Sequence, residues 1–392
     1  MANDRSDRDV SLDYLRATLT VLVVAHHSSL AYTTFASSDP GNYQGGTAPI
    51  VDAARWIVLD HAENLNDVFF MSAMFFISGL FVWRSLKRHG ATRFLRDRFV
   101  RLGLPFALGV LVLMPVAYYA AWLFSGGAPD YLAYWRNNLL RDGFTPGPLW
   151  FLWVLLLFDV VAAATFLVAR NLDAAFERVA RLGETRPLVL TLAILILCAA
   201  AYLPALAVFG FDAWRAFFTG PFYFQTSRFG LYLVWFVIGC VLGAKGITRG
   251  LLNPDGPMAR HGGAWFAAAV VIYLVMEFVP RAIFDAGLLP MARARPLYDV
   301  LWVASCVAST LGFLALFRQR MRTRSTLMNS LARCAYGVYV VHYIYVLWIQ
   351  YALLETPLHA GLKFLLTFAG ALALSWASAS LMLCIRPLRR VL

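Results

Sequence analysis

Long apolar runs separated by short polar segments dominate this chain. They predict transmembrane helices at residues 13–35, 66–84, 102–124, 148–169, 188–210, 227–244, 264–280, 297–317, 335–354 and 361–384, because about 20 apolar residues are needed to cross a bilayer as a helix. Segment 50–66, IVDAARWIVLDHAENLN, has an apolar run too short to span, so we expect it to be interfacial or re-entrant. The pattern predicts an all-α, polytopic membrane helical bundle of about ten transmembrane helices, forming a single domain over residues 1–392 with no soluble domain.

The basic residues are distributed unequally between the two sides of such a bundle. With these spans, 25 of the 34 Lys and Arg residues, Arg16 included, fall on the side that holds both termini, and nine fall on the other. Because basic residues accumulate in cytoplasmic loops, both termini are expected in the cytoplasm and the 125–147 loop outside. Residues 1–12 are expected to form a short cytoplasmic tail that lacks the apolar core and cleavage site of a signal peptide.

The composition narrows the class of protein. The chain is 60% hydrophobic and 14% charged, whereas soluble domains are about 45–50% apolar and about 25% charged. The net charge of +12 fits positive loops at a membrane better than nucleic-acid binding, so no nucleic-acid partner is expected. The five cysteines form no CxxC pair and are expected to be buried apolar residues. No P-loop, HExxH, GxSxG or Rossmann pattern is present, which disfavours an ATP-driven pump, a soluble-type hydrolase or a metal site.

Arg16 and His27 are costly residues inside the first predicted span, and their spacing places them on one helix face. Eleven residues at about 100° each come within about 20° of three full turns, about 16 Å along the axis. We expect this face to line a polar cavity rather than lipid. His27 can act as a general base near neutral pH, or it can be a packing histidine bonded to a neighbouring helix. His26, about 100° around the helix, is the alternative working histidine.

A second polar cluster begins near the end of the second predicted span and continues into the loop after it. Ser78 and Gly79 form a small pair that lets another helix or a ligand approach closely. The next segment carries seven basic residues: Arg84, Lys87, Arg88, Arg93, Arg96, Arg98 and Arg101. They suit plain positive-inside topology and lipid headgroups. They equally suit the phosphates of a cytoplasmic ligand, because arginine binds phosphate through two parallel hydrogen bonds.

Two later spans also carry polar side chains. Trp150 and Trp153 lie near the outer interface, where an aromatic belt is expected in any membrane protein. Asp159 is mid-span and is expected to pair with an Arg or a His inside the bundle. Tyr339 and His342 belong to a polar face with three- to four-residue spacing, in CAYGVYVVHYIYV.

Taken in order, these segments resemble membrane acyltransferase family 3. The family's Arg-x10-His pattern corresponds to Arg16 and His27. Its later motifs correspond to FFISGL at 75–80, RFVRLGLP at 98–105, WFLWVLLLF at 150–158 and YGVYVVH at 336–342. Order and spacing agree over nearly the whole chain. The length and the lack of an appended periplasmic esterase domain resemble the glucan biosynthesis protein C branch.

The resemblance implies a reaction and a set of site residues. An acyl group, acetyl or succinyl, would move from cytoplasmic acyl-CoA to a hydroxyl of a periplasmic or cell-surface glycan, in the bacterial inner membrane. Acyl-CoA would be a donor substrate rather than a permanently bound cofactor. His27 would be the catalytic base, with Arg16 and His26 as further catalytic candidates. Donor contacts are expected from Arg93, Arg98, Arg101, Ser78 and Gly79, and acceptor contacts from Trp150, Trp153, Asp159, Tyr339, His342 and Glu63. A homo-oligomer is left open.

Two other functions compete with acyl transfer. Intramembrane His, Arg and Asp also mark the substrate paths of a secondary transporter or flippase for a glycan or small anion. Against a transporter, the sequence shows no inverted repeat and no matched pair of interrupted helices. A sensor or scaffold without chemistry would not need the Arg16–His27 face.

Overall fold

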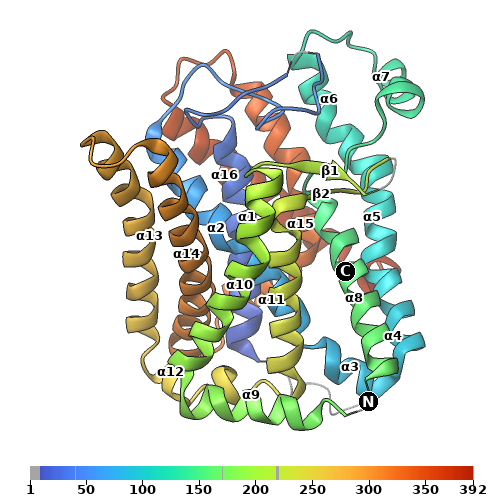
Figure 1. Cartoon of the computed structure of the whole chain (residues 1–392). Coiled ribbons are helices and arrows are strands. Elements are labelled where there is room, and N and C mark those ends of the chain that lie inside the picture. The colour runs from blue at the N-terminus through green and yellow to red at the C-terminus, as the bar shows by residue number, and fades with distance from the viewer. Residues whose placement is uncertain (1–8, 40, 170, 218–219, 392) are drawn as a thin grey trace.

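The computed structural model describes residues 9–39, 41–169, 171–217 and 220–391. Long helices pack side by side, and loops and short elements gather at two opposite ends (Figure 1). The long helices are α1 (Val10–Leu30), α2 (Ile57–Gly79), α8 (Trp150–Val168), α10 (Pro187–Phe209), α11 (Thr226–Ala244), α13 (Gly262–Asp285), α14 (Met291–Arg320), α15 (Thr326–Leu353) and α16 (Ala360–Met382). The third predicted span is built from α4 (Ala91–Arg98), α5 (Leu104–Leu108) and α6 (Met114–Phe124), joined by two π-helical stretches, η1 (Phe99–Gly103) and η2 (Gly109–Leu113).

Each of the ten predicted spans coincides with one of these helical segments. Within the described residues, eight segments are long and apolar enough, by length and composition, to cross a membrane. The two long helices outside that set are α1 and α15, which carry the histidines singled out by the sequence. Both are largely buried in the bundle, with His26, His342 and Gln350 among their buried polar residues.

The expectation for segment 50–66 is wrong, because the segment is not one separate element. Residues 51–56 are extended, and α2 begins at Ile57, nine residues before the predicted span. Asp60 and Glu63 lie in the first two turns of α2, where they face a polar cavity rather than lipid. The helix can therefore include these carboxylates without exposing them to hydrocarbon.

Several short elements lie outside the ten predicted spans. The 125–147 loop contains α7 (Tyr131–Asn137) and the π-helical η3 (Asn138–Asp142), and leads into η4 (Gly147–Leu149). An antiparallel hairpin of β1 (Trp214–Ala216) and β2 (Tyr223–Gln225) precedes α11. At the opposite end lie α3 (Val82–His89), α9 (Asp173–Thr185), η5 (Gly250–Leu252), α12 (Pro257–Arg260) and α17 (Leu388–Val391). Residues 1–8 of the predicted N-terminal tail lie outside the described residues, and α1 begins at Val10.

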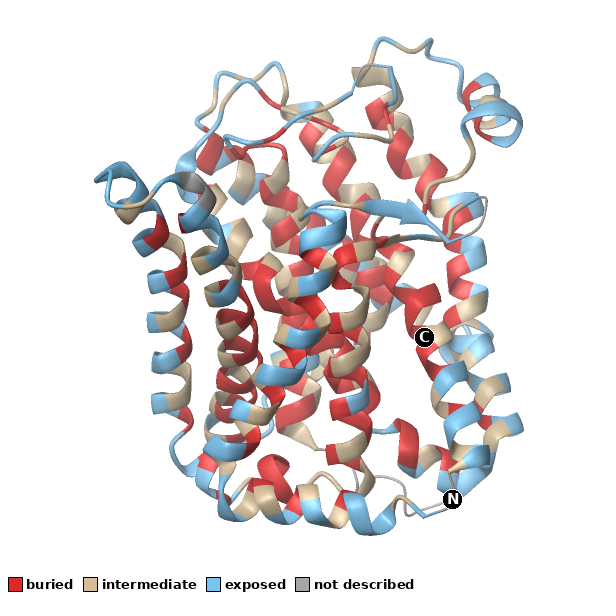
Figure 2. Ribbon diagram, viewed as in Figure 1, coloured by how far each residue is buried: buried red, intermediate tan, exposed pale blue. Residues whose placement is uncertain are grey.

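Burial separates the interior of the bundle from its outer helices. Buried residues concentrate on the inner helices, whereas α10 and α13 expose apolar side chains along their outward faces (Figure 2). The close contact between α2 and α11 depends on glycine, because a Cβ on Gly79 would lie 2.2 Å from the Phe236 carbonyl oxygen. Gly79 is therefore a helix-packing residue, as one of the two sequence readings proposed. Four of the five cysteines are buried, but Cys384 is exposed, contrary to expectation.

Prolines explain how the broken third span is tied to its neighbours. Pro105 has no N–H to give to the carbonyl of Arg101, four residues earlier. That carbonyl accepts a hydrogen bond from the Tyr336 hydroxyl on α15. Pro115 likewise offers no N–H to the carbonyl of Leu111, which accepts from the indole N–H of Trp135 at 3.4 Å. Side chains from other elements thus satisfy carbonyls that the prolines leave without a helical donor.

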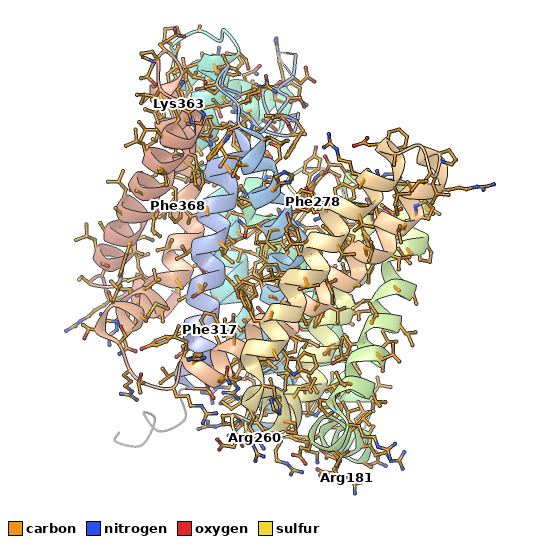
Figure 3. All side chains as sticks on the ribbon, turned by 90° about the vertical axis from the view of Figure 1, so that its left-hand side faces the viewer. Arg181, Arg260, Phe278, Phe317, Lys363 and Phe368 are labelled. Atoms are coloured by element: carbon orange, nitrogen blue, oxygen red, sulfur yellow. The ribbon has the colours of Figure 1, made fainter. Side chains whose placement is uncertain are left out.

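The two ends of the bundle differ in charge and are named accordingly. The basic end holds the start of α1 together with α3, α4, α9 and α12, and carries Arg181 and Arg260 (Figure 3). The acidic end holds the hairpin, α7 and the 35–49 loop (Figure 1). There the buried Lys363 Nζ lies 2.7 Å from Asp52 Oδ2, which ties the start of α16 to the segment before α2.

Candidate active site

A cavity of about 1000 Å³ opens at the acidic end of the bundle. Its walls come from α1, α2, α6, α11, α13, α14 and α15, and from the segments 35–49, 142–150 and 211–225. The 35–49 loop is anchored by Tyr43, whose hydroxyl donates to Asn138 Oδ1 at 2.5 Å. Burial is the main cause that raises the pKa of Tyr43 to about 12, so this hydroxyl keeps its proton and remains a donor at neutral pH. The loop thus has a fixed position over the cavity.

His27 lines this cavity and is paired with His342 on α15. His342 Nε2 lies 3.3 Å from His27 Nδ1, and the His342 side chain is fully buried. The backbone carbonyl of His27 also accepts a hydrogen bond from the Gln350 amide at 3.0 Å, so a second residue of α15 fixes α1 at this level. The sequence singled out both histidines, and the structure brings them together.

The partners of the two rings decide which nitrogen of each carries the proton. His342 Nδ1 lies 2.7 Å from the Tyr339 carbonyl, which can only accept, so Nδ1 is the N–H and Nε2 is an acceptor. His27 Nδ1 then has two acceptors, the Val23 carbonyl at 2.9 Å and His342 Nε2, and it must be the N–H of its ring. The remaining nitrogen, His27 Nε2, therefore carries a lone pair that can accept a proton, and His27 lines the cavity.

His26 faces a different neighbour, as the 100° helical step predicts. Its Nδ1 lies 3.6 Å from Glu63 Oε1 on α2, and its ring packs against Phe70 with centroids 4.9 Å apart. His26 is only 8% exposed, and its Nδ1 has no hydrogen-bond partner among the described residues. Both His26 and Glu63 line the cavity. The two adjacent histidines therefore line the same cavity but contact different neighbouring helices.

Opposite α1, a buried ion pair fixes α2 to α11. Arg228 donates to both carboxylate oxygens of Asp67 at 2.6 Å, and the Arg228 side chain is 2% exposed. Nearby, Glu277 on α13 accepts from the Asn64 amide at 2.5 Å and lies 2.6 Å from His61 Nδ1. A bidentate pair of this kind positions a guanidinium precisely. This wall of the cavity is therefore a network of charged groups held between three helices.

Aromatic side chains complete the cavity wall. Trp150 packs edge to face against Trp214 of the hairpin with centroids 5.5 Å apart, and against Tyr232 at 5.7 Å. Tyr343 meets His27 edge to face at 5.1 Å. Tyr339 also lines the cavity, and its hydroxyl donates to the Pro148 carbonyl. Of the predicted acceptor contacts, Trp150, Tyr339 and Glu63 therefore lie at the cavity, and His342 reaches it through His27.

Among the residues predicted for catalysis or acceptor binding, Arg16, Trp153 and Asp159 do not share this cavity. Arg16 lies near the basic end of α1, its side chain is 45% exposed, and it pairs with Asp13 at 3.3 Å. Trp153 is not a lining residue, and its indole N–H donates to the Tyr223 carbonyl at 2.9 Å, which supports the hairpin. Asp159 is fully buried and pairs with Arg98 at 3.4 Å. Pairing with an Arg or a His was expected, but Asp159 does not line the cavity. Arg16 and His27 share a helix face but lie at different positions along α1, so only His27 reaches the cavity.

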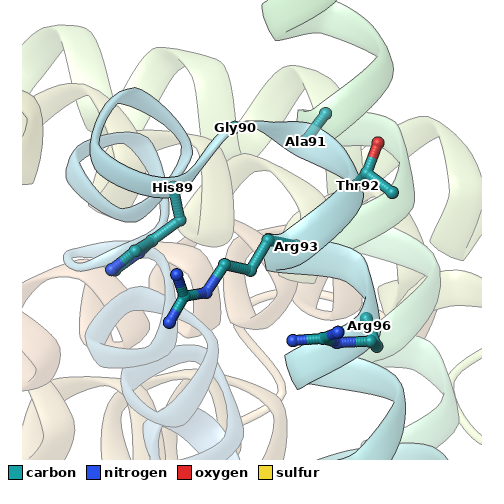
Figure 4. A pocket seen from close by; sticks show the side chains of 6 residues that line it. All are labelled: His89, Gly90, Ala91, Thr92, Arg93 and Arg96. Atoms are coloured by element: carbon teal, nitrogen blue, oxygen red, sulfur yellow. The ribbon is translucent and has the colours of Figure 1, made fainter.

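The basic end has a hollow of its own, of about 510 Å³, at the start of α4 (Figure 4). His89, Arg93 and Arg96 line it together with Gly90, whose φ of 76° allows the chain to turn from α3 into α4. Both arginines are exposed, and no carboxylate lines the hollow. Nearby, the Lys87 ammonium donates to Asp173 and lowers the pKa of that carboxyl.

The other predicted donor contacts differ in their surroundings. Arg98 is held by Asp159, and the exposed Arg101 is fixed through its backbone carbonyl by Tyr336. Ser78 donates to the Met74 carbonyl of its own helix at 2.8 Å. Of the predicted set, Arg93 and Arg101 are therefore the side chains left exposed at this end.

Sequence reasoning missed much of the cavity wall. Asp67 and Arg228 lie inside predicted spans, and a charge in a span is itself a signal for a functional or paired residue. Tyr343 belongs to the polar face that the sequence did recognise. Glu277 lies inside the predicted span 264–280 and carries the same signal of a charge in a span. Trp214 carried no usable signal, because nothing in its local sequence indicates that the hairpin reaches this cavity.

Comparison with known proteins assigns the family. A family model described as an acyltransferase domain (Acyl_transf_3) matches residues 9–379. No curated protein and no solved structure matches the chain. The match covers nearly all of the described helices, including both histidines of the pair. The chain therefore belongs to the acyltransferase family 3 of membrane proteins.

Proposed function

We propose that this membrane acyltransferase transfers an acyl group, acetyl or succinyl, from acyl-CoA to a hydroxyl of a glycan, with His27 as the general base. The observation that carries the proposal is the His27–His342 pair. It leaves His27 Nε2 as a free lone pair on a residue that lines a large polar cavity. A positioned base of this kind is what deprotonation of a sugar hydroxyl requires.

The chemistry needs only these groups and the two substrates. His27 Nε2 takes the proton of the acceptor hydroxyl while that oxygen attacks the thioester carbonyl. The tetrahedral intermediate collapses with cleavage of the C–S bond, and the CoA sulfur leaves with the proton from the imidazolium. His342 keeps the His27 ring in the tautomer that exposes Nε2 and accepts the Nδ1–H throughout. His342 is thus a positioning residue.

The donor is proposed to bind from the basic end. Arg93 and Arg96, with His89 beside them, offer cations and backbone N–H groups around the start of α4 (Figure 4). No carboxylate lines the hollow itself, and the nearby Asp97 lies 3.8 Å from Arg96. Phosphates are favoured at such a helix start. The acyl chain and its pantetheine arm would extend between the helices toward His27, while the sugar enters from the acidic end. This arrangement places the basic end in the cytoplasm.

The decisive experiment follows label from the acyl group of acyl-CoA. The full-length protein, purified in detergent, is mixed with labelled acetyl-CoA or succinyl-CoA and a neutral gluco-oligosaccharide, and products are read by mass spectrometry. The oligosaccharide should gain one acyl mass, with release of free CoA in equal amount. Uptake of the glycan into proteoliposomes without any acyl transfer would instead identify a transporter.

The orientation is tested separately. Single cysteines introduced at exposed positions such as Arg181 at the basic end and Leu140 at the acidic end are labelled in intact spheroplasts with an impermeant maleimide. We expect labelling at position 140 from outside, and at position 181 only after the membrane is opened. The reverse pattern would contradict the proposed entry sides of donor and acceptor.

A further inference from the structure

The cavity beside His27 has a strongly one-sided charge. Its lining carboxylates are Asp60, Glu63, Asp67, Asp142, Asp212 and Glu277. Arg228 is the one Lys or Arg among its described lining residues, and it is already engaged by both oxygens of Asp67. With neutral histidines, these groups give the lining a formal charge of −5. A cavity lined by one sign of charge attracts or repels ligands well before contact.

These carboxylates are not all free to approach a ligand. Asp60 accepts from the backbone and side chain of Thr34, and Glu277 is taken by His61 and Asn64. Glu63 is different, because its one ion-pairing neighbour within 4 Å in the described chain would be His26, at 3.6 Å, and only if that ring is protonated. Its side chain is 13% exposed, and the nine-tenths-buried His26 beside it has an Nδ1 without a hydrogen-bond partner. The Glu63 carboxylate is thus accessible from the cavity next to the proposed base, and the buried His26 Nδ1 lies behind it.

The cavity also offers flat aromatic rings to a ligand. Trp150, Trp214 and Tyr232 form a contiguous aromatic group, with centroid distances of 5.5 and 5.7 Å from Trp150. Such amphipathic faces cover the C–H faces of a sugar ring without contributing charge. A site built for an anionic sugar would need a guanidinium or ammonium free to pair with it.

We propose that the acceptor is a sugar without net negative charge, and that the acidic wall excludes anionic glycans from the cavity. Glu63 takes up a hydroxyl group of the bound sugar, which places the reacting hydroxyl near His27. This inference deepens the proposed function and rests on it for the role of the bound sugar. Exclusion by charge also argues against the passage of small anions through this cavity.

The test compares two matched acceptors on the full-length protein. One is a neutral gluco-oligosaccharide, and the other is the same oligosaccharide with its terminal C6 oxidised to a uronate. Binding is measured by calorimetry and transfer by kcat/KM, at 0.1 M and 1 M NaCl. Salt separates charge from shape, because the screening length falls from about 10 Å to about 3 Å between these concentrations.

A charge variant sharpens the comparison. Asp142→Asn with Asp212→Asn removes two exposed carboxylates of the lining while keeping their hydrogen-bond acceptors for Asn137 and Trp214. Glu355→Gln is the matched control, because Glu355 is exposed after α15 and does not line the cavity. The control should leave the preference unchanged.

We expect the neutral acceptor to bind at least about tenfold more tightly than the uronate at low salt. The ratio should narrow at 1 M NaCl and in the double variant. Equal or tighter binding of the uronate would overturn the inference, as would a preference that neither salt nor the double variant changes. If the binding preference holds but no acceptor receives an acyl group, the inference stands and the proposed acyl transfer fails.

Discussion

The two ends of this bundle offer opposite surroundings to their ligands. The cavity at the acidic end is deep, is lined by six carboxylates, and has its one arginine neutralised by Asp67. The hollow at the basic end is open, is lined by His89, Arg93 and Arg96, and includes no carboxylate. In the proposed reaction, opposite charges at the two ends would give the donor and the acceptor separate entrances to the bundle. A highly anionic donor such as CoA is attracted to one end and repelled from the other.

The ends also differ in how rigidly their groups are held. At the acidic end, the working groups are fixed by partners on other helices, as His27 is by His342 and Arg228 by Asp67. At the basic end, Arg93 and Arg96 are exposed and adjustable. Proton transfer needs groups that are held in fixed positions, whereas binding of a flexible phosphate chain tolerates exposed and adjustable side chains. Variants at the two ends should therefore separate kcat from KM.

The largest effect is expected from His27→Ala. Loss of a positioned base should reduce kcat by about 10²–10⁴-fold, with little change in the donor KM or in the amount of protein in the membrane. His26→Ala is the matched control, because its ring faces Glu63 and should affect the acceptor KM more than kcat. A tolerated His27→Ala combined with an inactive His26→Ala would show that the working histidine is misassigned. If both variants were tolerated, base catalysis from α1 would be wrong.

The next effect concerns the stability of the acidic end. Arg228→Met leaves Asp67 without its bidentate partner, and breaking a buried pair typically costs about 3–5 kcal/mol. Asp67 is 22% exposed to the cavity, so the lower end of that range is expected. Thermal unfolding in detergent measures the loss. The double variant Arg228→Met with Asp67→Leu should lose less than the two single variants added together. Strict additivity would contradict a direct coupling of the two residues.

The sequence predicted the helices well and the depth of their side chains poorly. All ten apolar runs became helical segments, because length and hydropathy are local properties. The Arg16–His27 spacing correctly describes one helix face, but a face spans the whole length of α1. Arg16 lies near its basic end, where an exposed guanidinium pairs with Asp13 instead of entering the cavity. A helical period predicts the direction in which a side chain projects around the helix axis. The surroundings of that side chain also depend on its position along the axis, through the membrane and the neighbouring helices.

The pairing of the site's residues depended on information that the sequence does not carry. His27 and His342 were both visible as polar residues in spans, yet 315 positions separate them, and their contact depends on which helices pack together. Asp159 shows the reverse case, since the need for a partner could be predicted but not its identity as Arg98. Glu63 lies in a segment that the sequence predicts to be interfacial or re-entrant, because its charges make the first turns of α2 unlike a span.

A smaller effect is expected from the basic end. Arg93→Ala with Arg96→Ala should raise the donor KM with kcat unchanged. Each lost charge-assisted contact should cost about 1.5 kcal/mol, at the low end because both side chains are exposed. Arg178→Ala with Arg181→Ala on α9 is the control, since it removes the same charge from the same end but not from the hollow. An equal rise in KM for both pairs would reduce the hollow to general electrostatic attraction. Arg98 is unsuitable for this test because its loss leaves Asp159 buried without its cation.

The smallest effect tests the link between α15 and the basic segment. Tyr336→Phe removes the hydroxyl that donates to the Arg101 carbonyl. A net cost of about 0.5–1.5 kcal/mol is expected, with a rise of a few-fold in the donor KM because the basic segment loses an anchor. Tyr345→Phe is the control, since it breaks the contact with Ser378 at 2.6 Å and should lower stability alone. Adding Pro105→Ala to Tyr336→Phe returns an N–H within reach of the Arg101 carbonyl and should recover the donor KM. A KM that stays raised in this double variant would show that the tyrosine ring, and not its hydrogen bond, positions the segment.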